Sequence, residues 1–304
     1  MDIAITGATG LVGTALIPAL RAAGHRPIAL IRPSSKPVSA DVIQWDPVAE
    51  TVDAASLEGI DAVVHLAGAG IGDKKWTDAR KHEILNSRVV GTRLISSTLG
   101  LLTKKPSVFL SGSAVGIYGD RGVETLDEYS ATSTDRSDFA ANVCREWEQA
   151  AEPAHTAGIR TAALRTGIVQ SIDGGALAKQ LPLFKLGIGG RIGSGKQYLS
   201  WISIDDEVNA IIHLLTADVD GPVNLTAPVP CTNDDFTKAL GKALHRPTFL
   251  PIPKFGPQLL LGKEATEHML YAGAKVMPTK LEASGFQFTY RTIHECLPAL
   301  IGKR

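Results

Sequence analysis

The segment that decides the fold is Thr6-Gly7-Ala8-Thr9-Gly10-Leu11-Val12-Gly13, which joins an apolar run at Asp2–Ile5 to an amphipathic run at Leu11–Ala23. In such a strand–turn–helix the first glycine permits a tight turn. The second lets a pyrophosphate approach the backbone, and the third lets the helix pack closely on the sheet. The free N–H groups at the start of the helix favour phosphate. The segment therefore predicts a dinucleotide site built by Gly7, Thr9, Gly10, Leu11, Val12 and Gly13. The alternatives are an ordinary tight turn and a methyltransferase that binds a nucleoside cofactor.

Apolar and amphipathic stretches alternate along the rest of the first half of the chain. They predict further strands at Pro27–Ile31, Asp61–Leu66, Val108–Ser111 and Thr161–Arg165, and helices at Trp76–Leu101 and Ser137–Ala154. Such alternation indicates a parallel sheet with helices on both faces. The predicted fold class is α/β, with a Rossmann-type doubly wound parallel sheet in a cofactor-binding domain over residues 1–166.

The composition changes after Thr166. Seven glycines between Gly174 and Gly195 predict loops and turns in that stretch. Later patterns predict a strand at Pro222–Leu225 and helices at Glu207–Thr216, Asp234–Leu244, Glu264–Ala274 and Thr292–Leu300. We interpret residues 167–304 as a smaller C-terminal α/β lobe on the substrate side, from which some segments return to the first domain.

The residue that ends the second predicted strand is basic. An NAD-selective site usually has an acidic residue here for the ribose 2′-hydroxyl. Arg32 instead offers a fork of donors that suits a 2′-phosphate, with Ser34, Ser35 and Lys36 nearby. NADP(H) is therefore the expected cofactor.

The composition limits which binding partners, cellular locations and metal sites we expect for the protein. The chain has 31 basic and 31 acidic residues, so no overall excess of positive charge points to nucleic acid or to an anionic membrane, although a local basic patch remains compatible. The N-terminus does not have the pattern of a secretory signal, and no apolar run is long enough to span a bilayer. The three cysteines are far apart, and no two histidines have the i, i+4 spacing of a metal site. We expect a cytoplasmic protein with no metal.

The motifs together resemble the extended short-chain dehydrogenase/reductase superfamily over nearly the whole chain. His65-Leu66-Ala67-Gly68 is similar to the segment that lines the adenosine side, which implies cofactor contacts from Leu66, Ala67 and Gly68. The run from Leu110 to Gly119 is similar to the segment with the active-site serine, here Ser113. Leu164-Arg165-Thr166-Gly167 is similar to the stretch beside the nicotinamide, which implies a cofactor contact from Arg165.

A narrower resemblance is to an atypical, epimerase-like branch of the NAD(P)-dependent epimerase/dehydratase family. It is indicated by Trp45-Asp46, Ser87-Arg88, Cys144-Arg145-Glu146-Trp147-Glu148, Gly193-Ser194-Gly195 and Trp201. The resemblance implies a small C-terminal domain near residues 232–300. It names no substrate.

The catalytic pattern of the superfamily is broken in this chain. Phe139 stands where the general acid/base tyrosine is expected, and Val143 stands where the lysine is expected, four residues later. Phenylalanine transfers no proton and valine donates no hydrogen bond. Arg88 replaces the usual asparagine. Tyr118 and Asp138 are alternative proton carriers, and Glu83 and Arg88 are candidates to reach the nicotinamide ribose or the substrate.

Two functions follow from this pattern. The first is an NADP(H)-dependent oxidoreductase or epimerase-like enzyme that acts on a small hydroxyl or carbonyl substrate. In it Ser113 bonds the reacting oxygen, and Tyr118 or a water supplies the proton. The second is a catalytically silent NADP(H)-binding sensor or interaction protein. A homodimer is an expected assembly, because paired long helices often form dimers in this superfamily.

Overall fold

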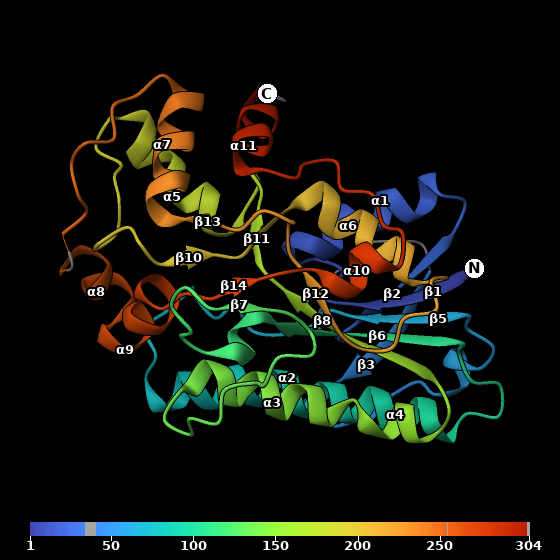
Figure 1. Ribbon diagram of the computed structural model, residues 1–304. Coiled ribbons are helices and arrows are strands. Elements are labelled where there is room, and N and C mark those ends of the chain that lie inside the picture. Colours follow the sequence, from blue (N-terminus) through green and yellow to red (C-terminus); the bar gives the residue numbers. More distant parts are fainter. Residues whose placement is uncertain (34–40, 254, 303–304) are drawn as a thin grey trace.

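One large β-sheet organises the molecule. A computed structural model describes residues 1–33, 41–253 and 255–302, so Ser34, Ser35 and Lys36 lie outside the described residues. The sheet has eight strands in the order β12-β8-β6-β5-β1-β2-β3-β4 (Figure 1). Their bounds are β1 Asp2–Thr6, β2 Arg26–Ile31, β3 Val42–Asp46, β4 Thr51–Val52, β5 Ala62–His65, β6 Val108–Ala114, β8 Arg160–Thr166 and β12 Gly221–Leu225.

The order of the strands is that of a doubly wound sheet. β1 pairs in parallel with β2 on one side and with β5 on the other. The sheet continues in parallel through β6, β8 and β12 on the β5 side and through β3 on the β2 side, whereas β4 is antiparallel to β3. This confirms the predicted Rossmann-type fold. The strand order reverses between β1 and β5, which is where open α/β sheets bind their ligands.

Helices cover both faces of this sheet, as Figure 1 shows. One face carries α1 (Leu11–Ala22) and α6 (Ile204–Leu214), and the other carries α2 (Asp78–Leu101), α3 (Phe139–Ala150) and α4 (Glu152–Thr156). Alternate residues of each strand point to opposite faces. Ile3 and Ile5 accordingly pack in the core beneath α1 and α6, while Ala4 packs in the core beneath α2, α3 and α4.

Two helices begin slightly later than predicted because of their caps. The Thr77 side chain accepts a hydrogen bond from the Arg80 N–H at 3.2 Å, so α2 starts at Asp78 rather than at Trp76. The Asp138 carboxylate accepts from the Ala141 N–H at 3.0 Å, so α3 starts at Phe139 rather than at Ser137. A side chain that bonds to the first turn stabilises a helix start typically by about 1 kcal/mol.

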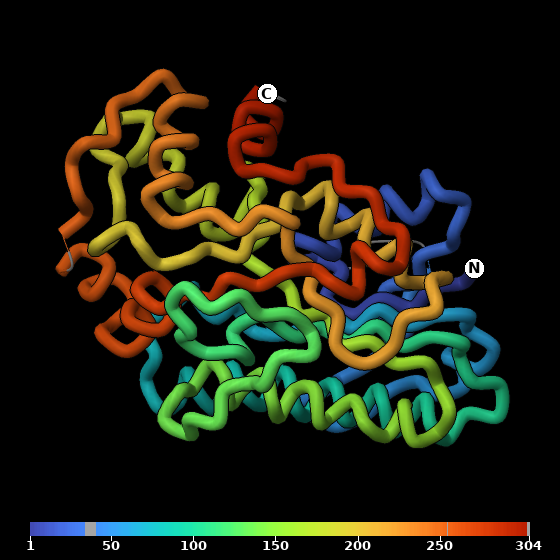
Figure 2. The backbone as a smooth tube through the Cα atoms, viewed as in Figure 1, coloured from blue at the N-terminus to red at the C-terminus, as the bar shows by residue number. Residues whose placement is uncertain are grey.

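The second lobe has its own core between α5 (Gly175–Lys185), α7 (Asn233–Leu244) and α11 (Ile293–Gly302). Figure 2 shows the chain leaving the sheet for this lobe and returning to it. β12 joins the large sheet and α6 packs on α1, while α10 (Thr279–Ala283) packs on β12. The remaining elements are β7 Thr125–Leu126, β9 Ile168–Gln170, β10 Tyr198–Leu199, β11 Trp201–Ser203, β13 Cys231–Thr232, β14 Lys275–Val276, α8 Phe255–Leu261 and α9 Lys263–Thr266, with short 3-10 turns at Ala55–Leu57 and Val115–Tyr118 and a π-helical turn at Glu267–Tyr271.

The prediction of loops throughout the glycine-rich stretch was wrong, because part of this stretch forms the helix α5. Gly174 and Gly175 lie at its start, and the ten residues after them contain no glycine. Leu177, Leu181 and Phe184 recur at helical spacing and are buried in the core of the lobe. Burial of this apolar face outweighs the breaking tendency of the flanking glycines.

Candidate cofactor and active site

The glycine-rich turn requires glycine at two of its positions. Gly7 has φ +70°, and a Cβ on it would lie 2.7 Å from the carbonyl carbon of Leu66. A Cβ on Gly13 would lie 2.3 Å from the carbonyl oxygen of Gly7. Both distances are too short for carbon contacts, so the turn packs directly on the end of β5 and on the first turn of α1. The predicted reasons for Gly7 and Gly13 are thus visible as geometry.

The start of α1 is open to an anion. Gly10 is the N-cap residue, and it has no side chain with which to cap the first-turn N–H groups. The first turn, which includes Leu11 and Val12, contains no acidic residue. The described turn therefore supplies no anionic side chain to the N–H groups and the positive end of the helix dipole.

A cleft of about 730 Å³ opens directly over this turn. It is bounded by the glycine-rich turn, the ends of β2 and β3, the segment after β5, and one face of α2. Its lining comprises Gly7, Ala8, Thr9, Gly10, Leu30, Ile31, Arg32, Trp45, Pro47, Val48, Glu50, Leu66, Ala67, Gly68, Ala69, Glu83, Asn86, Ser87 and Val90. This volume lies in the range of cofactor-sized sites.

Arg32 lies exposed at the edge of this cleft, immediately after β2. Trp45, Pro47 and Val48, from the end of β3 and the residues after it, also line the cleft. Sequence reasoning singled out Trp45 only as part of a family motif and did not predict β3. The signal it missed is the short alternating run Val42–Asp46, in which Ile43 and Trp45 are buried.

Hydrogen bonds of Thr6 and His65 join β1 and β5, the two strands whose ends border the cleft. The Thr6 hydroxyl oxygen accepts hydrogen bonds from the N–H groups of Leu66 at 3.1 Å and Ala67 at 3.2 Å, and it lies 2.8 Å from His65 Nδ1. Complete burial lowers the pKa of His65 to about 3, so its imidazole is neutral. Because the Thr6 oxygen already accepts two hydrogen bonds, its hydroxyl donates a hydrogen bond to Nδ1. Sequence reasoning did not single out Thr6.

Glu83 and Arg88 both lie on α2, but only Glu83 lines the cleft. Its carboxylate is 2.6 Å from Nη1 of Arg80. Arg88 lies behind Gly68, where its Nη1 donates to the carbonyl oxygens of Ala69 at 2.9 Å and Ile84 at 3.1 Å. Its guanidinium stacks 4.9 Å from the ring centre of Trp147. Arg88 thus supports the segment that lines the cleft.

Ser113 belongs to a buried charged network that sequence reasoning did not predict. Its hydroxyl donates to Oε1 of Glu148 at 2.6 Å. Arg165 donates two hydrogen bonds to the same carboxylate, from Nε to Oε1 at 2.8 Å and from Nη2 to Oε2 at 2.9 Å. The third nitrogen of Arg165, Nη1, donates to the Tyr118 hydroxyl at 2.9 Å. All three guanidinium nitrogens thus bond to protein groups, which differs from the expected cofactor contact of Arg165.

Tyr118 does not line the cleft. Its side chain is fully buried, and its hydroxyl lies 2.9 Å from both the Asn224 side-chain oxygen and the Asp127 carbonyl oxygen. Burial raises the pKa of Tyr118, which keeps the hydroxyl protonated. The turn that follows β6 directs this side chain back toward β12 and away from the solvent, which does not suit the expected role of Tyr118 as a proton carrier.

The positions of the missing tyrosine and lysine are filled by an apolar cluster. Val143 is buried together with Trp76, Ile84 and Ala265, and Phe139 packs against the group. The Phe139 and Trp76 rings meet edge to face with centres 5.0 Å apart. The cluster joins α2, α3 and α9, so the segment around α9 closes over the two positions.

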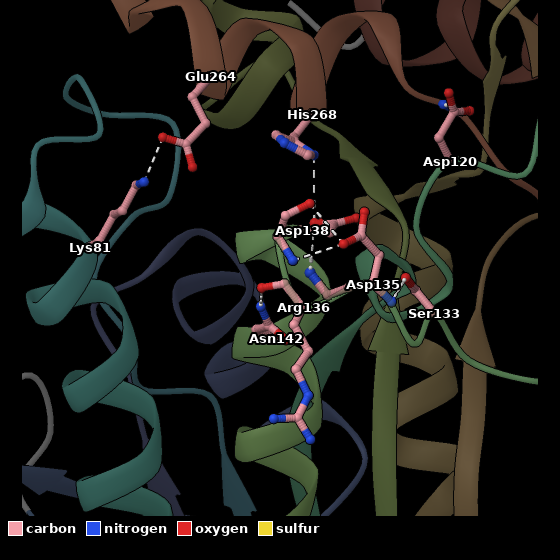
Figure 3. Close-up of polar contacts among 12 residues, drawn as sticks. Lys81, Asp120, Ser133, Asp135, Arg136, Asp138, Asn142, Glu264 and His268 are labelled. Atoms are coloured by element: carbon pink, nitrogen blue, oxygen red, sulfur yellow. Dashed lines mark hydrogen bonds and ion pairs between the residues drawn. The ribbon is translucent and has the colours of Figure 1, made fainter.

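An ion pair and a second polar contact hold the segment around α9 in place, as Figure 3 shows. Lys81 of α2 lies 2.5 Å from a carboxylate oxygen of Glu264. His268 Nδ1 lies 3.5 Å from Oδ1 of Asp138, the same oxygen that caps α3. Asp138 therefore both caps α3 and contacts the imidazole of His268.

Other kinds of site receive no support from the described part of the chain. No group of three His, Cys, Asp or Glu side chains there could hold a metal ion. No helix among the same residues combines the length and apolarity needed to cross a bilayer.

A separate hollow of about 580 Å³ lies on the outer surface where α2 meets α3 and α4, with Leu101 exposed beside it. The expected homodimer and cytoplasmic location stay predictions.

Comparison with known proteins identifies the family. The profile of the NAD dependent epimerase/dehydratase family matches residues 3–226. The chain belongs to this family. A second profile, for a domain of unknown function named DUF1731, matches residues 252–300. These matches confirm the resemblance to an epimerase-like branch with a small C-terminal domain.

Individual relatives cover the whole length of this family member. Epimerase family protein MT2273 of Mycobacterium tuberculosis is 39% identical over 296 residues, which cover 97% of this chain and 96% of the relative. The crystal structure of human epimerase family protein SDR39U1 with NADPH has a TM-score of 0.91, 33% identity and 100% coverage of both chains. That of a nucleoside-diphosphate sugar epimerase from Corynebacterium glutamicum has a TM-score of 0.76 and 35% identity, and covers 99% of this chain and 58% of the other.

Proposed function

We propose that this chain binds NADP(H) in the cleft over the glycine-rich turn and acts as an oxidoreductase or epimerase-like enzyme on a small hydroxyl or carbonyl substrate. The observation that carries the proposal is the uncapped start of α1 beneath a cleft of about 730 Å³. A diphosphate fits there because backbone N–H groups and a helix dipole stabilise it without a side chain. The relative crystallised with NADPH supports the choice of cofactor.

Different residues around the cleft would bind different parts of the cofactor. Thr9, Gly10 and the first turn of α1, from Leu11 to Gly13, hold the diphosphate. Arg32 holds the 2′-phosphate, and Leu66, Ala67 and Gly68 border the adenosine side. Glu83, on the α2 wall, and Arg88, behind Gly68, serve the ribose or substrate side. When bound, the nicotinamide donates or accepts a hydride.

Ser113 would bond the reacting oxygen of the substrate, supported by Glu148. A serine hydroxyl that donates to a carboxylate keeps its own oxygen lone pairs for a second hydrogen bond. Glu148 in turn is fixed by two hydrogen bonds from Arg165. We assign proton supply to a water rather than to Tyr118, because the Tyr118 hydroxyl is already engaged inside the protein.

A second function is favoured by one specific observation. Phe139 and Val143 belong to an apolar cluster rather than to a polar active site, so this chain could serve as an NADP(H)-binding sensor without turnover. The apolar side chains do not interfere with the phosphate cradle, because the cluster and the glycine-rich turn belong to separate sets of contacts.

One experiment separates the two functions. Purified protein is incubated with NADPH and a panel of aldehydes, ketones and quinones, and the loss of NADPH absorbance is followed. Consumption with at least one carbonyl compound, and none without it, supports the enzyme. Tight NADPH binding with no consumption across the panel contradicts a net oxidoreductase; it is the result expected of the sensor and also of an epimerase-like enzyme, which regenerates its cofactor in each turnover.

A further inference from the structure

Positive charge is concentrated in two segments of the smaller lobe. Residues 174–204 and 236–263 together contain nine lysines and arginines and no aspartate or glutamate. The rest of the chain has 22 basic against 31 acidic residues. The zero net charge of the whole chain therefore hides a strong asymmetry, which is the pattern of a protein that binds an anionic partner through one face.

The fold brings these two segments together. Arg246 Nε donates to the carbonyl oxygen of Lys185 at 2.8 Å, and the Ile252 N–H donates to the carbonyl oxygen of Arg191 at 2.9 Å. Ile252 also forms a parallel bridge with Ile192. In Figure 2 the yellow and orange parts of the tube run side by side along one edge of the molecule, and this edge leads to α8.

The same edge exposes large apolar side chains. Phe249 is 78% exposed, Phe255 73%, Leu259 71% and Leu260 74%, and Leu186 beside Lys185 is 73% exposed. Eight of the thirteen large apolar residues that are exposed among the described residues lie within 183–188 and 249–260. We call this surface, residues 183–191, 246–253 and 255–263, the cationic–apolar face. Large exposed apolar side chains gathered on neighbouring segments in this way indicate an interaction site.

We propose that the cationic–apolar face docks the protein on the surface of an anionic phospholipid bilayer. Leucine and phenylalanine side chains on a short projecting helix can enter the boundary between headgroups and acyl chains. Lysine and arginine beside them attract anionic headgroups. A bilayer accepts a projecting face such as α8 without needing a matching hollow. Two copies of this chain would instead oppose each other with like charges.

Docking would occur away from the cofactor cleft. The cationic–apolar face belongs to the smaller lobe, whereas the cleft is lined by residues between Gly7 and Val90. Cofactor binding therefore serves as an independent measure of correct folding. The docking proposal does not depend on the hydride chemistry proposed above.

Vesicle co-sedimentation tests the proposal. The full chain is mixed with vesicles of phosphatidylcholine alone or of phosphatidylcholine with phosphatidylglycerol, at low and high salt. We expect binding to the vesicles with phosphatidylglycerol, weaker binding at high salt, and little binding to phosphatidylcholine. The triple variant Phe255→Ser, Leu259→Ser, Leu260→Ser and the double variant Lys185→Glu, Lys263→Glu should each weaken binding by more than about tenfold, since each cation near the surface is worth about fivefold.

Matched controls are offered by the far end of α2. Leu101 is 88% exposed and Lys105 is exposed, and neither lies in the cationic–apolar face. Leu101→Ser and Lys105→Glu should leave vesicle binding unchanged, and all variants should keep their NADPH affinity. Absence of wild-type binding to both kinds of vesicle would overturn the proposal. So would binding to heparin or polyglutamate beads, but not to vesicles, because it would identify a site for a soluble polyanion or an acidic protein.

Discussion

The hydroxyl of Ser113 and the carboxylate of Glu148 are joined by a 2.6 Å hydrogen bond, across a sequence separation of 35 residues. Ser113 is the next-to-last residue of β6. Glu148 lies on α3, nine residues after the Phe139 that replaces the expected tyrosine. Arg165 of β8 holds the carboxylate from the other side. The residue expected to bond the substrate therefore has a fixed anionic partner in a site that lacks the tyrosine–lysine pair.

Replacing Glu148 tests the energetic importance of this network. We expect Glu148→Ala to lower the free energy of unfolding by about 3 kcal/mol, because Arg165 is left almost fully buried without its partner. Glu148→Gln keeps an acceptor for Ser113 and should cost less. Urea denaturation of the two variants and the wild type measures the difference. An unchanged stability in Glu148→Ala would contradict the account.

Arg32 should determine the choice between the two nicotinamide cofactors. Because only NADPH has the 2′-phosphate, we expect Arg32→Ala to weaken NADPH by about 2 kcal/mol and to leave NADH nearly unchanged. Calorimetric titration with each nucleotide measures both affinities. An equal loss for the two nucleotides would remove the argument for a 2′-phosphate site.

Restoring the missing lysine should damage the fold. Val143 is buried within the apolar cluster of Trp76, Ile84 and Ala265. We expect Val143→Lys to lower the free energy of unfolding by about 3 kcal/mol or more, because a buried ammonium would have no partner there. Phe139→Tyr, at a half-buried position, is the matched substitution and should cost less than about 1.5 kcal/mol. Thermal denaturation that shows Val143→Lys to be as stable as the wild type would contradict this arrangement.

A buried carboxyl should make stability depend on pH. Burial raises the pKa of Glu207 to about 8, while Oε1 accepts a hydrogen bond from the Thr166 hydroxyl at 2.9 Å. Between the ordinary pKa of 4.5 and about 8, the unfolded chain releases a proton that the folded chain keeps. The contribution of Glu207 to the free energy of unfolding therefore falls as pH rises through this window and levels above it.

Glu207→Gln should abolish that fall, so the variant gains stability over the wild type by a few kcal/mol at pH 8. Denaturation curves at several pH values provide the comparison. His65 contributes in the opposite direction between about 3 and 6.5, but it is present in both proteins and cancels in the difference. Parallel stability curves for the two proteins would show that Glu207 is ionised in the fold.

Features set by local chemistry were predictable from the sequence. The turn from Thr6 to Gly13 combines a strand, three spaced glycines and a helix within eight residues, and the structure reproduces each part. The sequence predicted the long helix α2 to within two residues of its ends, but its start at Asp78 is explained only by the Thr77 cap that the structure shows. Arg32 was placed correctly just beyond β2, because the strand that ends at Ile31 fixes where the next residue lies.

Features set by contacts between distant segments were not predictable. Tyr118 meets Asn224, which is 106 residues away in the chain, and nothing near Tyr118 indicates that its hydroxyl faces inward. Glu148 lies in a motif quoted for the family, yet its partner Ser113 is identified only when α3 packs against β6. The charge asymmetry of the smaller lobe is visible in the sequence, but only the fold shows that its two acid-free segments are neighbours.

The central claim is that the cleft over the glycine-rich turn holds NADP(H), and titration calorimetry with NADPH tests it most directly. The wild-type protein should bind one NADPH per chain. Gly13→Ala should weaken that binding by more than about tenfold, since its Cβ would lie 2.3 Å from the Gly7 carbonyl oxygen. Gly256→Ala, where a Cβ meets open space, should bind as the wild type does. Failure of the wild-type protein to bind either NADPH or NADH would contradict the account.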